Sequence, residues 1–325
     1  MKNLFRKLEN YPIAMCGTAL GLITLSNSFT SLGYSGLTTI AISFGIIALY
    51  LMVLKVIVYP HKIIEELKSP VTGSFYPTFD MALFLIAAYL YKGDPLMGKI
   101  LWFSAVIIHI ALFLIFFGFR ARKFKMEDML PSWFIQLVGM VVGTVSGIEM
   151  GYKTISLILL IVGTVLYFCV WPFMIYRLFK KEKIKESIAP AIAVLSAPAS
   201  LCISGYLAYT NNPNLILLGI LFVTSIFNLV YVYIKIPRAL KKGFSPIHGA
   251  FTFPLAISLL AMLKLASYTD FIGYTTLGVI LRGVAIFELV ITTVLIVYVI
   301  VNFIIMFIKA IISSFKKEQQ AKIEE

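Results

Sequence analysis

Side chains that could hold a metal ion or attack a substrate are few in this sequence and lie far apart. The chain has no CxxC, no HExxH and no other cluster of cysteine and histidine; these residues are Cys16, Cys169, Cys202, His61, His109 and His248. It also has no P-loop, no GxSxG nucleophile motif and no GxGxxG nucleotide motif. We therefore predict no catalytic residue, no metal site and no cofactor, and packing explains the cysteines better than a disulfide.

Two features stand out within apolar segments of the chain. Phe253 is followed directly by Pro254 within the apolar segment His248–Met262, HGAFTFPLAISLLAM. Proline inside a helix removes a backbone donor and clashes with the preceding turn, which costs about 3 kcal/mol or more. In a membrane such a helix is tolerated where neighbouring helices or a water-filled lumen satisfy the freed backbone groups. Asp80, three residues after Pro77, lies in another apolar segment. The meaning of both features depends on whether these segments cross a membrane.

Composition indicates that they do. The chain is 60% hydrophobic with a mean hydropathy of +0.95, against roughly 45–50% apolar residues in soluble domains. A helix needs about 20 mostly apolar residues to cross the bilayer. Stretches without Asp, Glu, Lys or Arg are 10–54, 100–119, 129–148, 154–176, 187–234, 243–263 and 289–308. The two longest split at Ser26–Gly36 and Thr210–Asn214, and 75–91 is interrupted only by Asp80. The sequence thus predicts an all-α integral membrane protein with ten transmembrane helices.

The basic residues predict the orientation. If both termini are cytoplasmic, 23 of the 28 Lys and Arg residues lie on the cytoplasmic side, as the positive-inside rule requires. The remaining five lie on the outer side or at span ends: Lys92, Lys99, Lys153, Lys264 and Arg282. We expect a multi-pass protein of the cell membrane with a cytoplasmic N-terminus (1–11), a transmembrane domain (12–308) and a cytoplasmic tail (309–325). This topology explains the net charge of +13 better than nucleic-acid binding, since the basic residues are dispersed among the spans.

The spans form five hairpins with short outer turns. The predicted pairs are 12–30 with 37–58, 75–91 with 96–118, 131–149 with 154–176, 188–209 with 214–236, and 247–267 with 276–308. Odd spans carry proline near their cytoplasmic start or in their first half and are richer in small residues, whereas even spans are dominated by bulky aliphatic and aromatic residues. Small residues permit close helix approach and also leave a lumen open. We interpret the odd spans as an inner ring and the even spans as an outer ring, around either a central pore or a solid core.

Three segments carry a resemblance to a known family. SPVTGSFYPTFDMALFLIA (Ser69–Ala87), SAPASLCISGYL (Ser196–Leu207) and GAFTFPLAISLLAM (Gly249–Met262) resemble the tellurite-resistance/dicarboxylate transporter family. That family includes bacterial tellurite-resistance membrane proteins, fungal malate and sulfite transporters and the slow-type anion channels of plants. The resemblance covers nearly the whole chain in span count, hairpin pairing and proline placement.

The resemblance implies an assembly and a gate. Members of the family are homotrimers in which each protomer has five hairpins around a central pore, lined by the odd helices and closed by a phenylalanine. The match assigns that gate to Phe253, with Pro77, Pro198 and Pro254 as kinks of the pore helices. A ring across a narrow passage excludes water and ions sterically and by dewetting. The alternative is that Phe253 packs in the helix core.

Charges on the predicted inner helices are few. Asp80 is the charge at depth, and Glu149 lies near an outer end. Asp80 has two interpretations: it is paired away from the lumen, or it faces the lumen and disfavours anions. Arg282 and Glu288 in the tenth span are interpreted as outer-ring or interface charges without a function. A pore lined mainly by apolar and hydroxyl groups passes anions because no charge traps them.

Three functions remain open. The leading one is a passive channel for small monovalent anions such as chloride or nitrate, occluded by Phe253. The second is a secondary transporter or exporter of sulfite, a C4-dicarboxylate or a tellurium oxyanion. The third is a membrane enzyme acting on lipids, for which the sequence shows no nucleophile and no pair of acid–base residues. The expected partners are small inorganic anions, membrane lipid and two further copies of the chain, and no nucleic acid.

Overall fold

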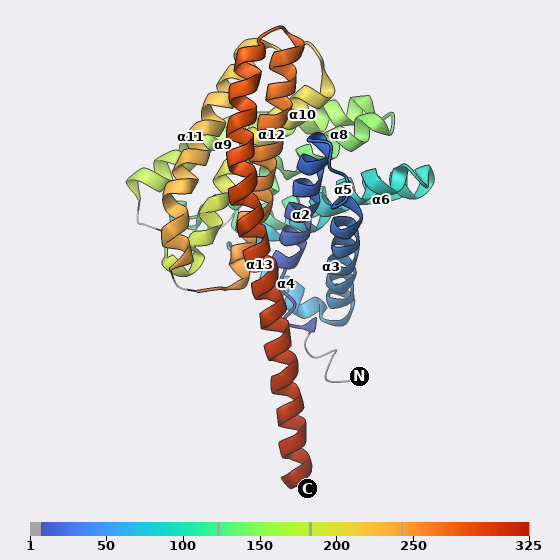
Figure 1. Cartoon of the computed structure of the whole chain (residues 1–325). Helices are drawn as coiled ribbons and strands as arrows, with labels where there is room; N and C mark the ends of the chain where they lie inside the picture. The colour runs from blue at the N-terminus through green and yellow to red at the C-terminus, as the bar shows by residue number, and fades with distance from the viewer. Residues whose placement is uncertain (1–7, 122–123, 182–183, 242, 325) are drawn as a thin grey trace.

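The computed structural model describes residues 8–121, 124–181, 184–241 and 243–324. Within these ranges the chain is helical and contains no strand (Figure 1). The all-α prediction is therefore confirmed for the described part of the chain. The predicted N-terminal segment 1–11 is described from residue 8 onward. Seven of the basic residues used to predict the topology lie outside the described residues: Lys2, Arg6, Lys7, Arg122, Lys123, Lys183 and Lys242.

The long helices and the short 3₁₀ segments (η) follow one another along the chain. Their order is α2 (Ala14–Ser31), α3 (Thr38–Val58), α4 (Pro60–Lys68), η1 (Gly73–Phe75), α5 (Thr78–Tyr91), α6 (Pro95–Arg120), η2 (Met126–Asp128), α7 (Trp133–Val138), η3 (Gly139–Val141), α8 (Val142–Glu149), α9 (Lys153–Lys180), η4 (Glu186–Ser196), α10 (Ala197–Tyr209), α11 (Leu215–Leu240), η5 (Pro246–Phe251), α12 (Thr252–Phe271) and α13 (Thr275–Glu324).

Eight helical segments in the described ranges are long and apolar enough to cross a membrane. They are Thr38–Val58, Gly73–Tyr91, Pro95–Arg120, Lys153–Lys180, Glu186–Tyr209, Leu215–Leu240, Pro246–Phe271 and Thr275–Ser313. The predicted spans 12–30 and 131–149 are not among them. In α2, hydroxyl groups donate hydrogen bonds to backbone carbonyl oxygens of the preceding helical turn, as those of Thr18 and Thr24 do. The stretch Trp133–Glu149 is short, and η3 interrupts it. Both are largely buried by protein, so they need no lipid-compatible surface.

Burial separates the helices into two sets. In the windows of Gly73–Tyr91, Glu186–Tyr209 and Pro246–Phe271, between 67% and 94% of the residues are buried. In the other five spanning helices the buried share is only 22% to 39%. The second set exposes large apolar side chains such as Ile107, Val165 and Ile234. Exposed aliphatic surface of this kind suits lipid or another protein surface, whereas the first set packs inside the molecule.

The buried segments contact one another in cyclic order. Helix α2 packs against α5, α5 against α8, α8 against α10, α10 against α12, and α12 again against α2. Each of them also contacts the long helix that follows it in the sequence, so that α3, α6, α9, α11 and α13 lie outside this circle (Figure 1). We call the circle of α2, η1–α5, α7–η3–α8, η4–α10 and η5–α12 the inner segments.

Short turns connect each inner segment to the helix that follows it, and their residues explain the geometry. Gly33, Gly151 and Gly273 have φ near +90°, a left-handed conformation that glycine adopts without steric cost and that commonly ends helices. The other two turns end at Asp94 and Asn214, whose side chains accept hydrogen bonds from the backbone N–H groups two and three residues later. We call this end of the bundle the turn face and the opposite end, where α2 begins, the terminal face.

Helix α13 runs along α12 and continues well beyond the bundle at the terminal face (Figure 1). The helix is unbroken from Thr275 to Glu324. The predicted boundary at residue 309 therefore does not coincide with an end of secondary structure.

Candidate functional site: two cavities separated by Phe253

The inner segments enclose a narrow cavity toward the terminal face. Each of the five contributes to its wall, with Gly17 from α2, Thr78 from α5, Val138 from α7, Leu201 from α10 and Phe253 from α12. The cavity volume is about 20 Å³, which is room for roughly one water molecule. None of the described residues that line it is charged. The cavity is therefore narrow and mainly apolar.

A second, much wider cavity lies toward the turn face. It has a volume of about 600 Å³ and is again lined by residues of all five inner segments, together with α3. Its wall is more polar than that of the narrow cavity and includes Thr24, Asn27, Ser146 and Ser204. The charged residues in this wall are Lys92, Glu149 and Lys264.

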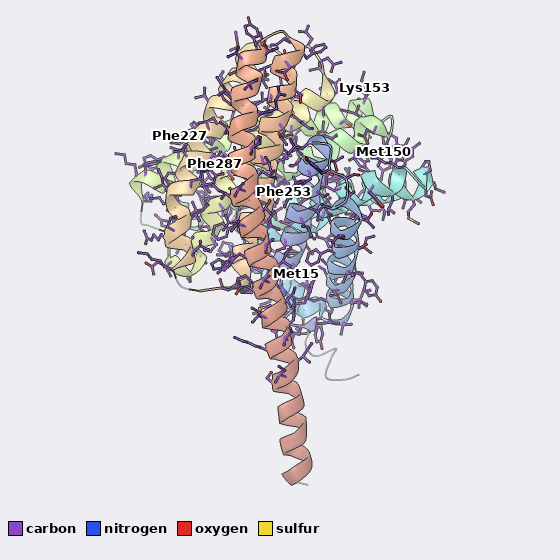
Figure 2. The ribbon with its side chains drawn as sticks, viewed as in Figure 1. Met15, Met150, Lys153, Phe227, Phe253 and Phe287 are labelled. Carbon is purple, nitrogen blue, oxygen red and sulfur yellow. The ribbon has the colours of Figure 1, made fainter. Side chains whose placement is uncertain are left out.

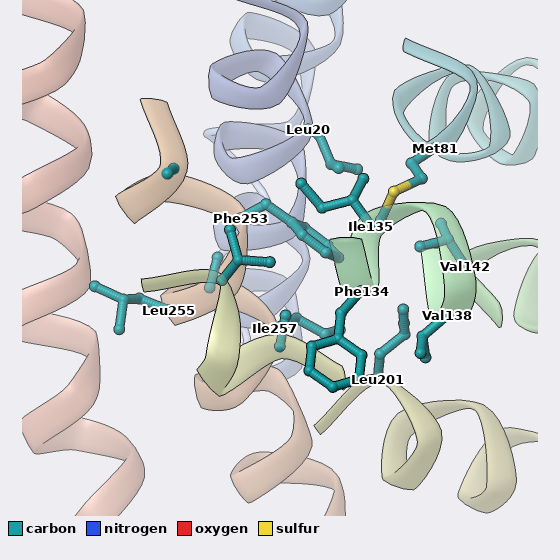
Figure 3. Close-up of a cluster of buried hydrophobic side chains, with 14 of the residues drawn as sticks. Leu20, Met81, Phe134, Ile135, Val138, Val142, Leu201, Phe253, Leu255 and Ile257 are labelled. Atoms are coloured by element: carbon teal, nitrogen blue, oxygen red, sulfur yellow. The ribbon is translucent and has the colours of Figure 1, made fainter. Parts of the chain in front are cut away.

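Phe253 belongs to the walls of both cavities and thus lies at the boundary between them. Its side chain is almost fully buried, at 5% exposure. Figure 2 shows it deep in the bundle, between the level of Met15 and that of Met150. Figure 3 shows it in one apolar cluster with Phe134, Val138 and Leu201. Leu201 also lines both cavities. Together these two side chains separate the narrow cavity from the wide one.

Close packing of α2 against α12 holds the backbone at Phe253. Gly21 lies so near that a Cβ added to it would stand 2.5 Å from the Cβ of Thr252 and 2.6 Å from the backbone nitrogen of Phe253. The Thr252 hydroxyl lies 3.0 Å from the carbonyl oxygen of Gly17 and 2.8 Å from that of Gly249. Only glycine permits this approach, since any side chain at residue 21 would overlap the neighbouring backbone.

The three prolines predicted to kink the pore helices occupy equivalent places. Pro77 directly precedes α5, Pro198 is the second residue of α10, and Pro254 is the third residue of α12. In each case a 3₁₀ segment ends just before the α-helix begins, and the proline lies at this junction. Proline is tolerated in a first helical turn because the N–H groups there have no partner within the helix.

Asp80 lies on α5 but lines neither of the two cavities. It is fully buried, and its Oδ2 is 2.6 Å from Nδ1 of His109 on α6. Nε2 of His109 is 3.2 Å from the backbone oxygen of Gln136 on α7, and the Gln136 amide donates to the carbonyl oxygen of Gly73. This network ties α5 to α6 and α7 behind the cavity wall. The structure places Asp80 in the paired arrangement, one of the two considered from the sequence.

Two further aromatic residues lie at the narrow cavity but do not stand out in the sequence. Phe75 and Phe134 come from η1 and α7 and line the cavity with Phe253. Their exposures are 6% and 2%. Each lies within three residues of a proline in the same inner segment. This recurrence of an aromatic residue beside a proline is the signal that could have identified them.

The two charges of the tenth predicted span differ in their surroundings. Arg282 pairs with Asp270 of α12, with Nη1 2.7 Å from Oδ2. Glu288 is fully buried, and the side chain with which it interacts is Ser258 of α12. Neither residue lines the two cavities around Phe253.

No group of three or more His, Cys, Asp or Glu residues suited to a metal ion occurs in residues 8–121, 124–181, 184–241 and 243–324. The site consists of apolar, hydroxyl and a few charged side chains around a constriction. Such an arrangement can restrict or pass a solute.

The amino-acid sequence is similar to those of membrane transport proteins. The family described as SLAC1, voltage-dependent anion channel, matches residues 10–311. The chain is 26% identical over 259 residues to an uncharacterized transporter of Methanocaldococcus jannaschii, covering 70% of this chain and 75% of the relative. It is 24% identical over 301 residues to a tellurite resistance protein TehA homolog of Haemophilus influenzae, covering 88% and 87%.

Proposed function

The chain belongs to the SLAC1 family of voltage-dependent anion channels, and we propose that it is a passive channel for small monovalent anions such as chloride or nitrate. The match confirms the family suggested by the three sequence segments. It also makes the chain a multi-pass membrane transporter or channel for anions. The proposal adds the passive mechanism, the class of anion and the gate.

The observation that carries the proposal is the position of Phe253 between the two cavities. A phenyl ring that fills a narrow apolar passage raises the barrier for an ion by excluding its water shell. The small residues Gly17, Gly139 and Gly249 in the wall of the narrow cavity leave space that opens once the ring is absent or moves. Because no acidic residue lines that cavity in the described part of the chain, an anion would meet no like charge from these residues at the constriction.

We further propose that the ten helical stretches form five hairpins and that the inner segments surround one pore per protomer. The cyclic contacts of the inner segments support this arrangement. In the orientation proposed from the basic residues, the terminal face is cytoplasmic and the turn face is outside. A reporter enzyme that works only in the cytoplasm should be active when fused after Glu325, and activity only of an exported reporter would reverse the orientation.

We propose that three copies assemble. The exposed aromatic and aliphatic side chains on the outer helices, for example Phe103 of α6 and Phe173 of α9, offer apolar surface for contact between protomers. Crosslinking in native membranes should give a trimer, and mild-detergent extracts should contain particles of three chains plus detergent. A monomer in both measurements would remove the trimer from the proposal while leaving the pore within each protomer untouched.

A second candidate function is a carrier or exporter of sulfite, a C4-dicarboxylate or a tellurium oxyanion. The names of the two relatives, a transporter and a tellurite resistance homolog, favour it, as do the lysines Lys92 and Lys264 in the wall of the wide cavity. A carrier binds its substrate and changes conformation in every cycle, so its flux saturates and does not appear as discrete currents.

Recordings from the purified protein in a planar bilayer separate the two functions. The channel should give discrete unitary current steps that reverse near the equilibrium potential of chloride under a chloride gradient. Macroscopic flux without unitary steps, with saturation and with coupling to a second ion, would instead establish the carrier. A reversal potential near that of the cation would contradict both.

A further inference from the structure

Lys264 lies on the same side of α12 as Phe253, although it is eleven residues further along the helix. Eleven residues are close to three turns of an α-helix, so the two side chains leave the helix in nearly the same direction and about 16 Å apart. The residues at the intermediate positions of this stripe are Ile257 and Leu260. All four line the wide cavity. Lys264 is therefore part of the proposed anion path, on the turn-face side of the gate.

The ammonium group of Lys264 has hydrogen-bonding capacity to spare. Nζ donates to the backbone oxygen of Ser204 on α10, at 3.1 Å, and an ammonium group has three donors. Within the described residues no carboxylate lies within the 4 Å of an ion pair with Lys264. Two of its N–H groups thus remain for another acceptor.

The hydroxyl of the same serine is a second unused donor. Ser204 is 2% exposed, its Oγ has no hydrogen-bond partner within the described part of the chain, and the residue lines the wide cavity beside Lys264. A buried hydroxyl without a partner loses its hydrogen bonds to water and gains none in return, which is unfavourable unless a ligand or water binds there. Lys264 and Ser204 therefore both belong to the wall of the wide cavity, and each has a donor without a protein acceptor among the described residues.

The wall of the wide cavity carries two cationic side chains and one carboxylate, and the carboxylate of Glu149 interacts electrostatically with Lys264. Glu149 and Lys92 are the other charged residues of the wide cavity. Arg282 lines an adjoining cavity of about 360 Å³, whose wall also includes Lys264, and is paired with Asp270. Lys264 is thus the cation shared by both cavities.

We propose that Lys264 and the Ser204 hydroxyl form a binding site for a small inorganic anion in the wide cavity. The ammonium and hydroxyl groups replace part of the anion's water shell there before the anion reaches Phe253. The inference rests on the proposed function because that function places the cavity on the permeation path. The anion-binding chemistry itself requires only the cavity and its two donors.

Binding can be measured without any current. Thermal unfolding of the purified protein with Phe253 intact should shift to higher temperature in sodium chloride relative to sodium gluconate at equal ionic strength, since a ligand that binds the folded state stabilises it. We expect Lys264→Met to lose most of this shift. Lys264→Arg, which keeps the charge, should retain it.

Lys153→Met is the matched control. Lys153 is exposed at the start of α9, on the same turn face, and lines neither of the cavities that Lys264 borders. Its removal changes the net charge of the protein equally but should leave the chloride shift unchanged. If Lys264→Met merely lowers the unfolding temperature in both salts and preserves the difference between them, the lysine is a structural link to Ser204 and the proposal fails.

Current through the opened pore gives an independent readout. In a Phe253→Ala background, the added Lys264→Met substitution should raise the half-saturating chloride concentration on the order of tenfold, as expected from losing one charge-assisted hydrogen bond. An unchanged half-saturating concentration would overturn the site while the channel stands. A chloride-specific, Lys264-dependent thermal shift in a protein whose Phe253→Ala variant carries no current would establish the site and refute the channel.

Discussion

Phe253→Ala is expected to raise the anion current through the protein in a planar bilayer by at least about tenfold, the change produced by a barrier lower by about 1.4 kcal/mol. The ring of Phe253 lies between the narrow and the wide cavity and contributes to the walls of both. Its removal should widen the connection between the two cavities, at which only Leu201 among the described residues would still line both. Because none of the described residues that line the narrow cavity is charged, the selectivity for anions over cations should be preserved.

Phe251→Ala is the control for this result. Phe251 is as deeply buried as Phe253 and precedes it by two residues, but it packs against His248 and lines neither cavity. Truncation of a buried phenylalanine typically lowers the free energy of unfolding by about 3–5 kcal/mol. We expect Phe251→Ala to destabilise the protein without increasing the current.

A smaller truncation at Phe253 provides a second test of the gate. Phe253→Leu should increase the current less than Phe253→Ala does, since the leucine side chain still fills part of the constriction. Leu201 remains in both variants and continues to line both cavities. If both variants fold and conduct no better than the parent, the gate is not at Phe253. If Phe253→Ala only unfolds the protein, as Phe251→Ala is expected to do, the ring is a packing residue.

The second large effect concerns stability. Lys55→Met is expected to lower the free energy of unfolding by about 3–5 kcal/mol, as removal of one partner from a buried ion pair commonly does. Nζ of Lys55 is fully buried at the terminal face and donates to Glu66 Oε1 at 2.7 Å and to the backbone oxygen of Tyr11 at 2.8 Å. Glu66 Oε2 also accepts from the Tyr76 hydroxyl at 2.6 Å. The substitution leaves a mostly buried carboxylate without its cation and a carbonyl oxygen without its donor.

Lys62→Met is the matched control because Lys62 forms a similar pair, 2.8 Å from Glu65, in the same region but at the surface. Exposed ion pairs contribute little to stability, so the unfolding temperature in detergent should scarcely change. The double variant Lys55→Met with Glu66→Leu should recover part of the lost stability, since it removes both charges together. Equal unfolding temperatures for Lys55→Met and the parent would show that the pair does not hold these elements together.

The local and periodic properties of this protein could be determined from its sequence alone. Charge-free stretches of about 20 residues located most of the long helices, because the need to bury apolar surface acts on each segment separately. The difference between small-residue and bulky segments likewise separated buried from exposed helices, as η5–α12 and α6 illustrate. The assignment of Phe253 drew on family resemblance as well, since an aromatic residue before a proline is equally compatible with a packed core.

The tertiary structure alone decided which side chains meet. The partner of Asp80 is His109, 29 residues away on another helix, and hydropathy does not say which faces of two helices touch. Lys264 marks the end of a charge-free stretch in the sequence, yet in the structure its side chain reaches Ser204, 60 residues away, in the wall of the wide cavity. The cavities themselves are formed by the five inner segments, with α3 contributing to the wall of the wide one. Their existence depends on how those segments pack around one another, which is a property of the folded chain and not of any segment in it.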